Sequence, residues 1–221
     1  MLMAMYDSDA ASPPDDFRPR SIPSLAVHSL DDAHRAEVEA FIGDVYARRF
    51  GARLTHFAPM LVSLRDADGR ILAAAGYRSA TDAPLFLERY LSAPVEALLV
   101  SDAGMAPARQ AIVEVGHLAA VESGEGRRLI LLLGPHLAER GFQWVVSTLT
   151  QELRRLFLRL GVTPLALGIA DPTALGENAA HWGSYYDHRP VVLAGQLQQA
   201  LRRLSRQTAR TADDAAPGEQ P

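Results

Sequence analysis

Apolar positions in the first half of the chain alternate between helical and strand spacing. After Ser29-Leu30-Asp31-Asp32, a helix entry, apolar residues recur at helical spacing and predict a helix over about 32–50 that ends near Gly51. Two strand-like runs follow, at 60–65 and 70–77. Asp66-Ala67-Asp68-Gly69 between them is a turn signal, so the pattern predicts an antiparallel hairpin. Residues 85–91 are helical in character, and a second short helix is expected at about 93–100.

The second half predicts strands and helices in alternation. The expected elements are a strand at about 111–121, a helix at 126–140, a strand at 143–148, a helix at 150–160, a strand at 163–168, a strand at 190–194 and an amphipathic helix at 195–204. Gly141 and Gly161 are placed to end the first two helices. Strand, helix, strand repeats favour parallel pairing. With the hairpin before them, these elements predict an α/β fold with a mixed central sheet flanked by helices.

Length and composition favour one domain. The 221 residues are 48% hydrophobic, which suffices for one large core, expected over 23–204. Residues 1–22 and 205–221 lack apolar periodicity and are predicted to be disordered tails. The formal charge of −4 argues against a nucleic-acid partner. The chain has no cysteine, no signal-peptide pattern and no apolar run long enough to span a membrane, so we expect a cytoplasmic protein.

A glycine-containing turn lies where the strand at 111–121 passes into the next helix. Glu122-Ser123-Gly124-Glu125-Gly126 aims backbone N–H groups beyond the strand end, and the helix N-terminus adds partial positive charge. A pyrophosphate or a carboxylate suits such a turn. The residues expected to hold a phosphate-bearing donor are Val115, Gly116, Leu118, Gly124, Gly126, Arg127, Arg128, Ser147 and Thr148. For Thr148, helix capping together with Thr150 is the alternative.

The order of elements and this turn resemble the GNAT acyltransferases. That family binds the coenzyme A pyrophosphate at a Gln/Arg-x-x-Gly-x-Gly/Ala turn, and here Val121 stands at its first position while both glycines are kept. The family often places a tyrosine four residues before the glycine that ends the next helix, as a proton donor to the thiolate. Here Phe157 stands before Gly161, so that donor must come from elsewhere.

Two further resemblances point to acyl transfer. The acyl-homoserine lactone synthases carry an Arg at an early strand end and a Glu-x-x-Arg in the central strand, where this chain has Arg78 and Glu114-Val115-Gly116-His117. A resemblance to the thermostable hemolysin family covers about 50–197, through FGARLTHFAPMLVSL, IVEVGHLAA, WVVSTLTQELRRLFLRLG and HWGSYYDHRPVVLAG. That family name implies red-cell lysis, although its members resemble acyltransferases in fold.

Glu114 and His117 are the central catalytic candidates. Glu114 lies in an apolar strand, where a carboxylate is costly unless it is paired or used. It is either the partner of a buried arginine such as Arg78 or a general base with a raised pKa. In a regular strand Glu114 and His117 face opposite sides, but a bulge at Gly116 would direct both into one cleft. Without the bulge, His117 is a hydrogen-bonded core residue.

Other candidates would hold the acceptor or close the cleft. Arg78 suits a substrate carboxylate, with an ion pair to Glu88 as its rival. His181-Trp182-Gly183-Ser184-Tyr185-Tyr186-Asp187 is either a lid, with a tyrosine as proton donor, or an anchor for the last strand. Tyr185 is therefore a catalytic candidate, and the expected substrate-binding residues are Arg78, Glu88, Trp144, Trp182 and Tyr186. No metal site is expected, because His56, His136 and His188 lack acidic partners at ligand spacing.

These residues favour an N-acyltransferase. It would take an acyl group, with fatty acyl groups among the candidates, from acyl-coenzyme A or an acyl carrier protein and pass it to an amine, with the thioester near Glu114 and residues 144–147. No permanently bound cofactor is expected. A directly membrane-active hemolysin and a catalytically inactive donor-binding module are the alternatives, the former resting on the short C-terminal helix with Leu197, Leu201 and Leu204. Acyl length, acceptor and oligomeric state are open.

Overall fold

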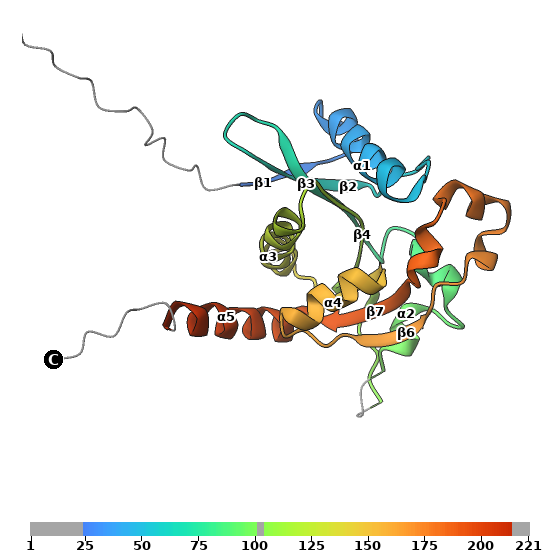
Figure 1. The fold of residues 1–221 in the computed structure, drawn as a ribbon. Coiled ribbons are helices and arrows are strands. Elements are labelled where there is room, and N and C mark those ends of the chain that lie inside the picture. Colours follow the sequence, from blue (N-terminus) through green and yellow to red (C-terminus); the bar gives the residue numbers. More distant parts are fainter. Residues whose placement is uncertain (1–23, 101–103, 214–221) are drawn as a thin grey trace, which may run out of the picture.

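One mixed β-sheet organises the computed structural model of the chain, which describes residues 24–100 and 104–213 (Figure 1). The strands are β1 (Leu25–His28), β2 (Met60–Arg65), β3 (Ile71–Ser79), β4 (Ile112–Ala120), β5 (Trp144–Leu149), β6 (Leu165–Ile169) and β7 (Val191–Gln196). They form a seven-stranded sheet in the order β1-β2-β3-β4-β5-β7-β6. The α-helices are α1 (Arg35–Phe50), α2 (Val95–Leu98), α3 (Ser123–Glu139), α4 (Gln151–Arg159) and α5 (Leu197–Asp213). The 3-10 segments are η1 (Phe86–Tyr90), η2 (Arg109–Ala111), η3 (Pro172–Trp182) and η4 (Tyr185–His188).

The second and third strands form the predicted hairpin. β2 and β3 pair antiparallel around a turn in which Gly69 takes a φ of 81°. Gly51 ends α1 in the left-handed region, with φ 64° and its N–H donating to the Ala47 carbonyl at 2.9 Å. β1, which the sequence pattern did not reveal, adds to the free edge of β2. The early part of the fold is therefore as predicted, with one additional strand.

Two layers of helices cover opposite faces of this half of the sheet. Leu61 packs toward α1 and its neighbour Val62 toward α3, as the two-residue period of a strand requires. Figure 1 shows α1 on one side of β2–β4 and α3 on the other. A third cluster places Leu87 of η1 and Val95 of α2 against Ile112 and Val146. The core is thus continuous across β4 and β5.

Three predicted features differ in the structure. β4 and β5 are parallel as expected, but β7 lies between β5 and β6 and pairs antiparallel with both, so the expected parallel pairing of the third strand is wrong. A helical pattern cannot tell which strand its crossover reaches. α3 begins at Ser123 rather than about 126, which places both predicted turn glycines inside its first turn. Residues 85–91 form a 3-10 turn rather than an α-helix.

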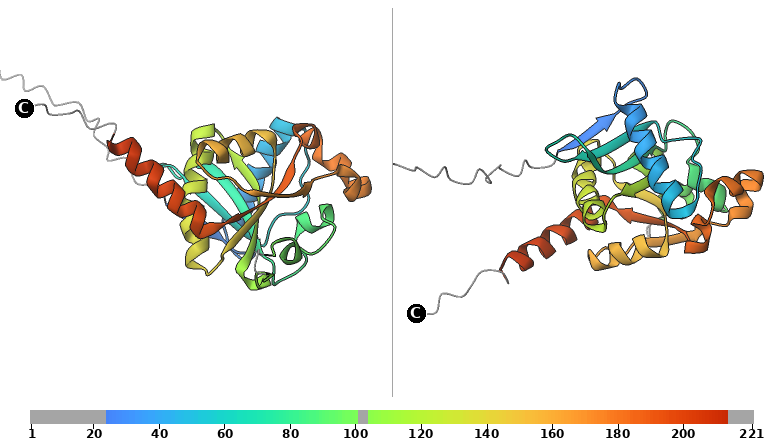
Figure 2. Two further views of the ribbon diagram at one scale, coloured as in Figure 1. Left: turned by 90° about the horizontal axis from the view of Figure 1, so that it is seen from below. Right: turned by 45° about the horizontal axis from the view of Figure 1, so that its top comes forward.

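The last helix is longer than its apolar pattern indicated. α5 runs to Asp213, so part of the segment expected to be a tail is helical, while residues 214–221 and the predicted tail at 1–22 lie outside the described residues. Figure 2 shows this helix projecting from the body. Leu197 is buried and Leu201 packs on the core cluster of α3. Within the described residues no helix combines the length and apolar character that crossing a bilayer demands.

Candidate active site between the diverging central strands

β4 and β5 separate partway along the sheet. Their pairing covers Ile112, Val113 and Glu114 and then stops, although β4 continues to Ala120 and β5 to Leu149. β4 remains paired with β3 on its other side, and β5 remains paired with β7. The strands therefore part in the middle of an otherwise continuous sheet. Backbone groups and side chains at this gap are accessible to a ligand.

A bulge in β4 changes which face of the sheet its side chains occupy at the gap. The register between β3 and β4 shifts between Ala74 and Gly76, and His117, opposite this shift, has a φ of 52°. Val115 packs in the cluster under α3, whereas Ala119 packs in the cluster under α1. Residues four apart share a face in a regular strand, so the bulge reverses the alternation. Of the two alternatives that the sequence left open, the structure shows the bulge, with the positive φ at His117 rather than at Gly116.

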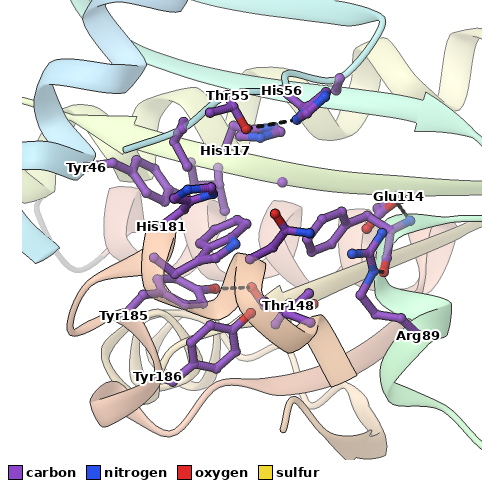
Figure 3. A pocket seen from close by; sticks show the side chains of 18 of the residues that line it. Tyr46, Thr55, His56, Arg89, Glu114, His117, Thr148, His181, Tyr185 and Tyr186 are labelled. Carbon is purple, nitrogen blue, oxygen red and sulfur yellow. Dashed lines mark hydrogen bonds between the residues drawn. The ribbon is translucent and has the colours of Figure 1, made fainter. Parts of the chain in front are cut away.

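The bulge brings Glu114 and His117 to one cavity of about 430 Å³ (Figure 3). The wall also contains Tyr46 from α1, Thr148 from β5, and residues of η1, η3 and η4. The remaining wall consists of Arg53, Leu54, Thr55, His56, Ala58, Arg78, Phe86, Arg89, Tyr90, Val115, Gly116, Leu118, Leu153, Leu175, Asn178, His181, Trp182, Tyr185 and Tyr186. Segments far apart in the sequence thus enclose the predicted pair.

Glu114 is held by the start of η1. Its carboxylate accepts hydrogen bonds from the backbone N–H groups of Phe86 at 2.8 Å and Leu87 at 3.0 Å. The Arg78 Nε lies 3.8 Å from its Oε2, beyond hydrogen-bond length. Burial raises the Glu114 pKa, while the Phe86 N–H, the Arg78 charge, the Leu87 N–H and the Arg89 charge oppose that rise. The carboxyl is thus fixed in orientation and more basic than an exposed one.

His117 and Thr148 each have a buried polar atom at this cavity without a hydrogen-bond partner in the described part of the chain. These atoms are the His117 Nδ1 and the Thr148 Oγ1. Burial and then the Arg78 charge lower the His117 pKa to about 4, against a hydrogen bond to the His56 backbone that raises it. The imidazole is therefore neutral near pH 7. Buried polar groups without partners are costly, which makes both side chains candidates for contact with a ligand.

Aromatic residues from the late 3-10 segments close one side of the cavity. Trp182 lies with its ring centroid 5.3 Å from that of Tyr185 and 5.6 Å from that of Phe86. Tyr185 donates to the Thr148 carbonyl at 3.2 Å, and burial raises its pKa well above the usual value. The hydroxyls of Tyr186 and Tyr90 are 2.6 Å apart. This wall is preorganised, and its tyrosines stay protonated.

A second, apolar cavity of about 110 Å³ lies near the gap and shares Val115 and Leu118 with the first. Its walls come from α3, α4, α5, β5 and β7, and they include Ser147 and Phe157. Phe157 replaces the tyrosine expected of a GNAT enzyme, so at this position the chain provides apolar surface instead of a proton donor. The two cavities differ in character, one polar and aromatic, the other aliphatic.

The geometry can now be compared with known proteins. Residues 28–201 match the sequence profile of the thermostable hemolysin family.

The chain belongs to the thermostable hemolysin family.

No curated protein sequence matches this thermostable hemolysin family member. Solved structures share its fold. BjaI, a CoA-dependent acyl-homoserine lactone synthase with SAM and isopentyl-CoA, superposes with a TM-score of 0.57 at 13% identity over 85% of this chain and 90% of its own. FeeM, an N-acyl amino acid synthase from uncultured soil microbes, gives 0.52 at 12% identity over 81% and 94%. A putative N-acetyltransferase from Lactobacillus plantarum gives 0.50 at 15% identity over 79% and 98%. The α/β fold is therefore the GNAT-like acyltransferase fold that the sequence predicts.

The predicted site residues of this hemolysin family member divide into two groups. Those lining the larger cavity are Arg78, Glu114, Val115, Gly116, His117, Leu118, Thr148, Trp182, Tyr185 and Tyr186. Ser147 lines the apolar one. Trp144 packs in the η1 cluster instead. Glu88 pairs with Arg109 at 2.8 Å, which lowers the Glu88 pKa to about 2, so the alternative Arg78–Glu88 ion pair is not formed. Their chemical roles stay predictions.

The glycine turn lies outside both cavities. Gly124, Gly126, Arg127 and Arg128 line neither of them. The Gly126 N–H donates to the Glu122 carbonyl at 3.3 Å, and Arg128 pairs with Glu125 at 3.0 Å. Neither glycine has positive φ, so neither is required by a left-handed turn. The predicted phosphate site is thus the N-terminus of α3, whose first turn contains Glu125, and its role stays a prediction.

Several cavity residues come from separate segments and are not predictable from local sequence patterns. Arg53 and His181 are joined by a backbone hydrogen bond of 2.6 Å from the Arg53 N–H to the His181 carbonyl. Tyr46 carried only the signal of helical periodicity, which equally describes a core residue. Arg89 did carry a signal, because it is a charged residue between aromatic ones in Phe86-Leu87-Glu88-Arg89-Tyr90. Its guanidinium carbon lies 3.8 Å above the Phe86 ring centroid.

Proposed function

We propose that this protein transfers an acyl group from a thioester donor, acyl-coenzyme A or an acyl carrier protein, to an amine. The observation that carries the proposal is the gap between β4 and β5, where the unpartnered polar atoms of His117 and Thr148 border one cavity. The carbonyl oxygen of a thioester in the gap would accept a hydrogen bond from the Thr148 hydroxyl, and the attacking amine would donate one to His117 Nδ1. The acyltransferase fold supports the same reaction class.

The two cavities suggest how the reactants are separated. The aliphatic cavity suits the acyl chain, since burying apolar surface contributes about 25 cal/mol per Å². The larger cavity suits the amine, because it contains the polar and ionisable groups. Val115 and Leu118, which line both, would then lie beside the thioester. The phosphates of the donor would approach the N-terminus of α3, where Ser123 and Gly124 begin the helix.

Glu114 is the candidate general base. The amine nitrogen bonds to the thioester carbonyl carbon, the C–S bond breaks, and one N–H proton passes by way of the Glu114 carboxylate to the departing sulfur. Burial raises the pKa of Glu114 and favours this role, whereas His117, with a pKa of about 4, is a weak base. His117 Nδ1 would accept a hydrogen bond that orients the amine. Tyr185, kept protonated by burial, is the candidate donor to the thiolate, and the proton that Glu114 takes from the amine would then reprotonate Tyr185.

Thiol release tests this proposal. The full-length protein is mixed with acyl-coenzymes of increasing chain length, or with acyl-loaded carrier protein, and free thiol is followed with and without amines. We expect release that depends on both substrates, with an N-acyl amide detected by mass spectrometry. Binding of donor without turnover would contradict the proposal and favour an inactive donor-binding module.

A dye-release measurement separates enzymatic from direct lysis. Liposomes loaded with a fluorescent dye are incubated with the protein alone, and then with protein, donor and amine together. A fatty acyl amide is amphipathic. Leakage that requires both substrates would therefore indicate that the product causes lysis. Leakage caused by protein alone would instead support a membrane-active hemolysin.

A further inference from the structure

The larger cavity has an excess of positive charge. Arg53, Arg78 and Arg89 line it, and Glu114 is the one carboxylate among its lining residues. That carboxylate is already engaged by the Phe86 and Leu87 N–H groups. A cavity with this balance disfavours a cationic ligand lacking a negative group and favours one that carries an anion.

Arg78 and Arg89 line the cavity with Glu114, and no hydrogen bond joins either guanidinium group to its carboxylate in the described structure. Arg78 on β3 is the register partner of Glu114 on β4, yet its Nε stays 3.8 Å from the carboxylate. Arg89 donates its Nε–H to the Phe86 carbonyl at 2.8 Å and stacks on the Phe86 ring, which fixes the plane of the guanidinium. Arg78, Arg89 and Glu114 line the same cavity, where burial raises the Glu114 pKa and the charges of both arginines lower it. Planar forks held in this way suit a carboxylate.

The rest of the wall indicates the other parts of the ligand. Glu114 itself provides negative charge for an ammonium group beside the arginines. The rings of Tyr90, Trp182 and Tyr186 line the cavity and offer apolar surface. Positive forks, one carboxylate and an aromatic wall together match a molecule with a carboxylate, an adjacent amine and an apolar side chain.

We infer that the acceptor of this site is an α-amino acid with an apolar or aromatic side chain, its carboxylate on Arg78 and Arg89 and its amine at Glu114. The inference rests on the proposed acyl transfer and specifies its acceptor. The ammonium gives one proton through Glu114 to solvent before the neutral amine attacks the thioester. The product is then an anionic N-acyl amino acid, and the released thiol takes the second N–H proton.

Direct binding to the full-length protein tests the acceptor class without requiring turnover. L-Phenylalanine, L-phenylalaninamide and phenethylamine share the ring and the amine, but only the first has a carboxylate; L-leucine and L-tryptophan vary the side chain. By calorimetry we expect at least one of the amino acids to bind, and L-phenylalanine to bind at least about tenfold more tightly than its two analogues. Equal affinities within that series, or no binding of any of the amino acids, would overturn the inference.

Variants of Arg89 test whether this arginine binds the carboxylate of the amino acid. Arg89→Gln is expected to weaken amino-acid binding by about 10- to 100-fold and phenylalaninamide binding far less, because only the amino acid loses a charge-assisted contact, whereas loss of the Phe86 contacts affects both ligands alike. Arg89→Lys retains the charge but not the fork and should give an intermediate loss. Arg70→Gln, at an exposed hairpin position outside the cavity, is the matched control. Circular dichroism and thermal unfolding verify that each variant folds.

Titration with coenzyme A shows whether the arginines bind the carboxylate of the amino acid or the phosphates of the donor. If Arg89→Gln weakens coenzyme A and not the amino acid, the arginines hold donor phosphates and the inference is wrong. Failure of the proposed function has a different signature: amino-acid binding with no thiol release from any donor would leave the acceptor assignment intact and remove the acyl transfer. Thiol release as fast with phenethylamine as with phenylalanine would support acyl transfer and contradict the assignment of an amino acid as acceptor.

Discussion

His28 and His117 are both histidines with buried ring nitrogens, and their surroundings are opposite. His28 on β1 is held between Asp32 at 3.0 Å and Ser63 at 2.9 Å, the arrangement of a serine hydrolase triad. Ser63 has 0% exposure, and no described cavity contains it. His117 leaves Nδ1 unpartnered beside a cavity of about 430 Å³. Complete hydrogen bonding without access indicates a structural role, whereas an unpartnered atom at a cavity indicates a ligand.

The difference also appears in backbone strain. His28 lies in regular antiparallel pairing with Leu61, whereas His117 has a positive φ, which is uncommon for residues other than glycine. Strained positions of this kind cluster at binding sites, where the surrounding structure maintains them. Each prediction below tests one side of this comparison.

We expect the largest effect on the rate of thiol release from replacing Glu114, and Asp32 is the carboxylate for comparison. Glu114→Gln should lower the rate of thiol release about 10²- to 10⁴-fold, because an amide cannot take the amine proton. Asp32→Asn, the matched change beside His28, should leave the rate unchanged. Since Glu114 also holds two N–H groups of η1, thermal unfolding is measured for both variants. A full rate in Glu114→Gln, or equal losses in both, would contradict the assignment.

The pH dependence of stability should report His117. The unfolded histidine binds a proton below its ordinary pKa of 6.5, but the folded one does so only below about 4. Acid therefore favours the unfolded state in this window, and stability should fall by about 3 kcal/mol as pH drops from 6.5 to 4. Glu114, whose pKa is raised, contributes in the opposite sense. Urea unfolding should show a smaller fall in His117→Gln; parallel curves would argue against a neutral buried imidazole.

His28→Gln should affect stability and not chemistry. It disrupts the bonds to Asp32 and Ser63 and leaves the buried Ser63 hydroxyl poorly satisfied, at a cost of about 1–3 kcal/mol in unfolding free energy. Its rate of thiol release should equal that of the wild type. Denaturant unfolding and the thiol assay are run on the same preparation. A loss of rate with unchanged stability would reverse the roles assigned to the two histidines.

The smallest effect concerns the triad-like serine. Ser63→Ala should cost about 1 kcal/mol of stability, from the lost hydrogen bond to His28. The wild-type protein should not react with a fluorophosphonate probe, because the hydroxyl has no exposed surface. Intact-mass measurement detects the adduct. Stoichiometric labelling that Ser63→Ala abolishes would show that this region opens and acts as a nucleophile.

Local patterns predicted most of the fold and part of the site. The hairpin around Gly69 and the helix ends at Gly51, Gly141 and Gly161 follow from short-range turn geometry, which the sequence states directly. Glu114 stood out because a carboxylate in an apolar strand requires compensation. β1 and the insertion of β7 beside β5 could not be predicted, since strand partners are chosen by distant segments. Arg53, Arg89 and His181 enter the cavity for the same reason.

The sequence by itself determined the family, the α/β order of elements, and the presence of Glu114, His117 and a run of aromatic residues near the C-terminal strand. Only the tertiary structure decided that β4 and β5 part after Glu114, that a bulge turns His117 to the same side, and that arginines from two segments surround that carboxylate. The physical reason is that apolar periodicity encodes which face of an element is buried. Cavities, unpartnered atoms and charge balance arise only where several buried faces meet.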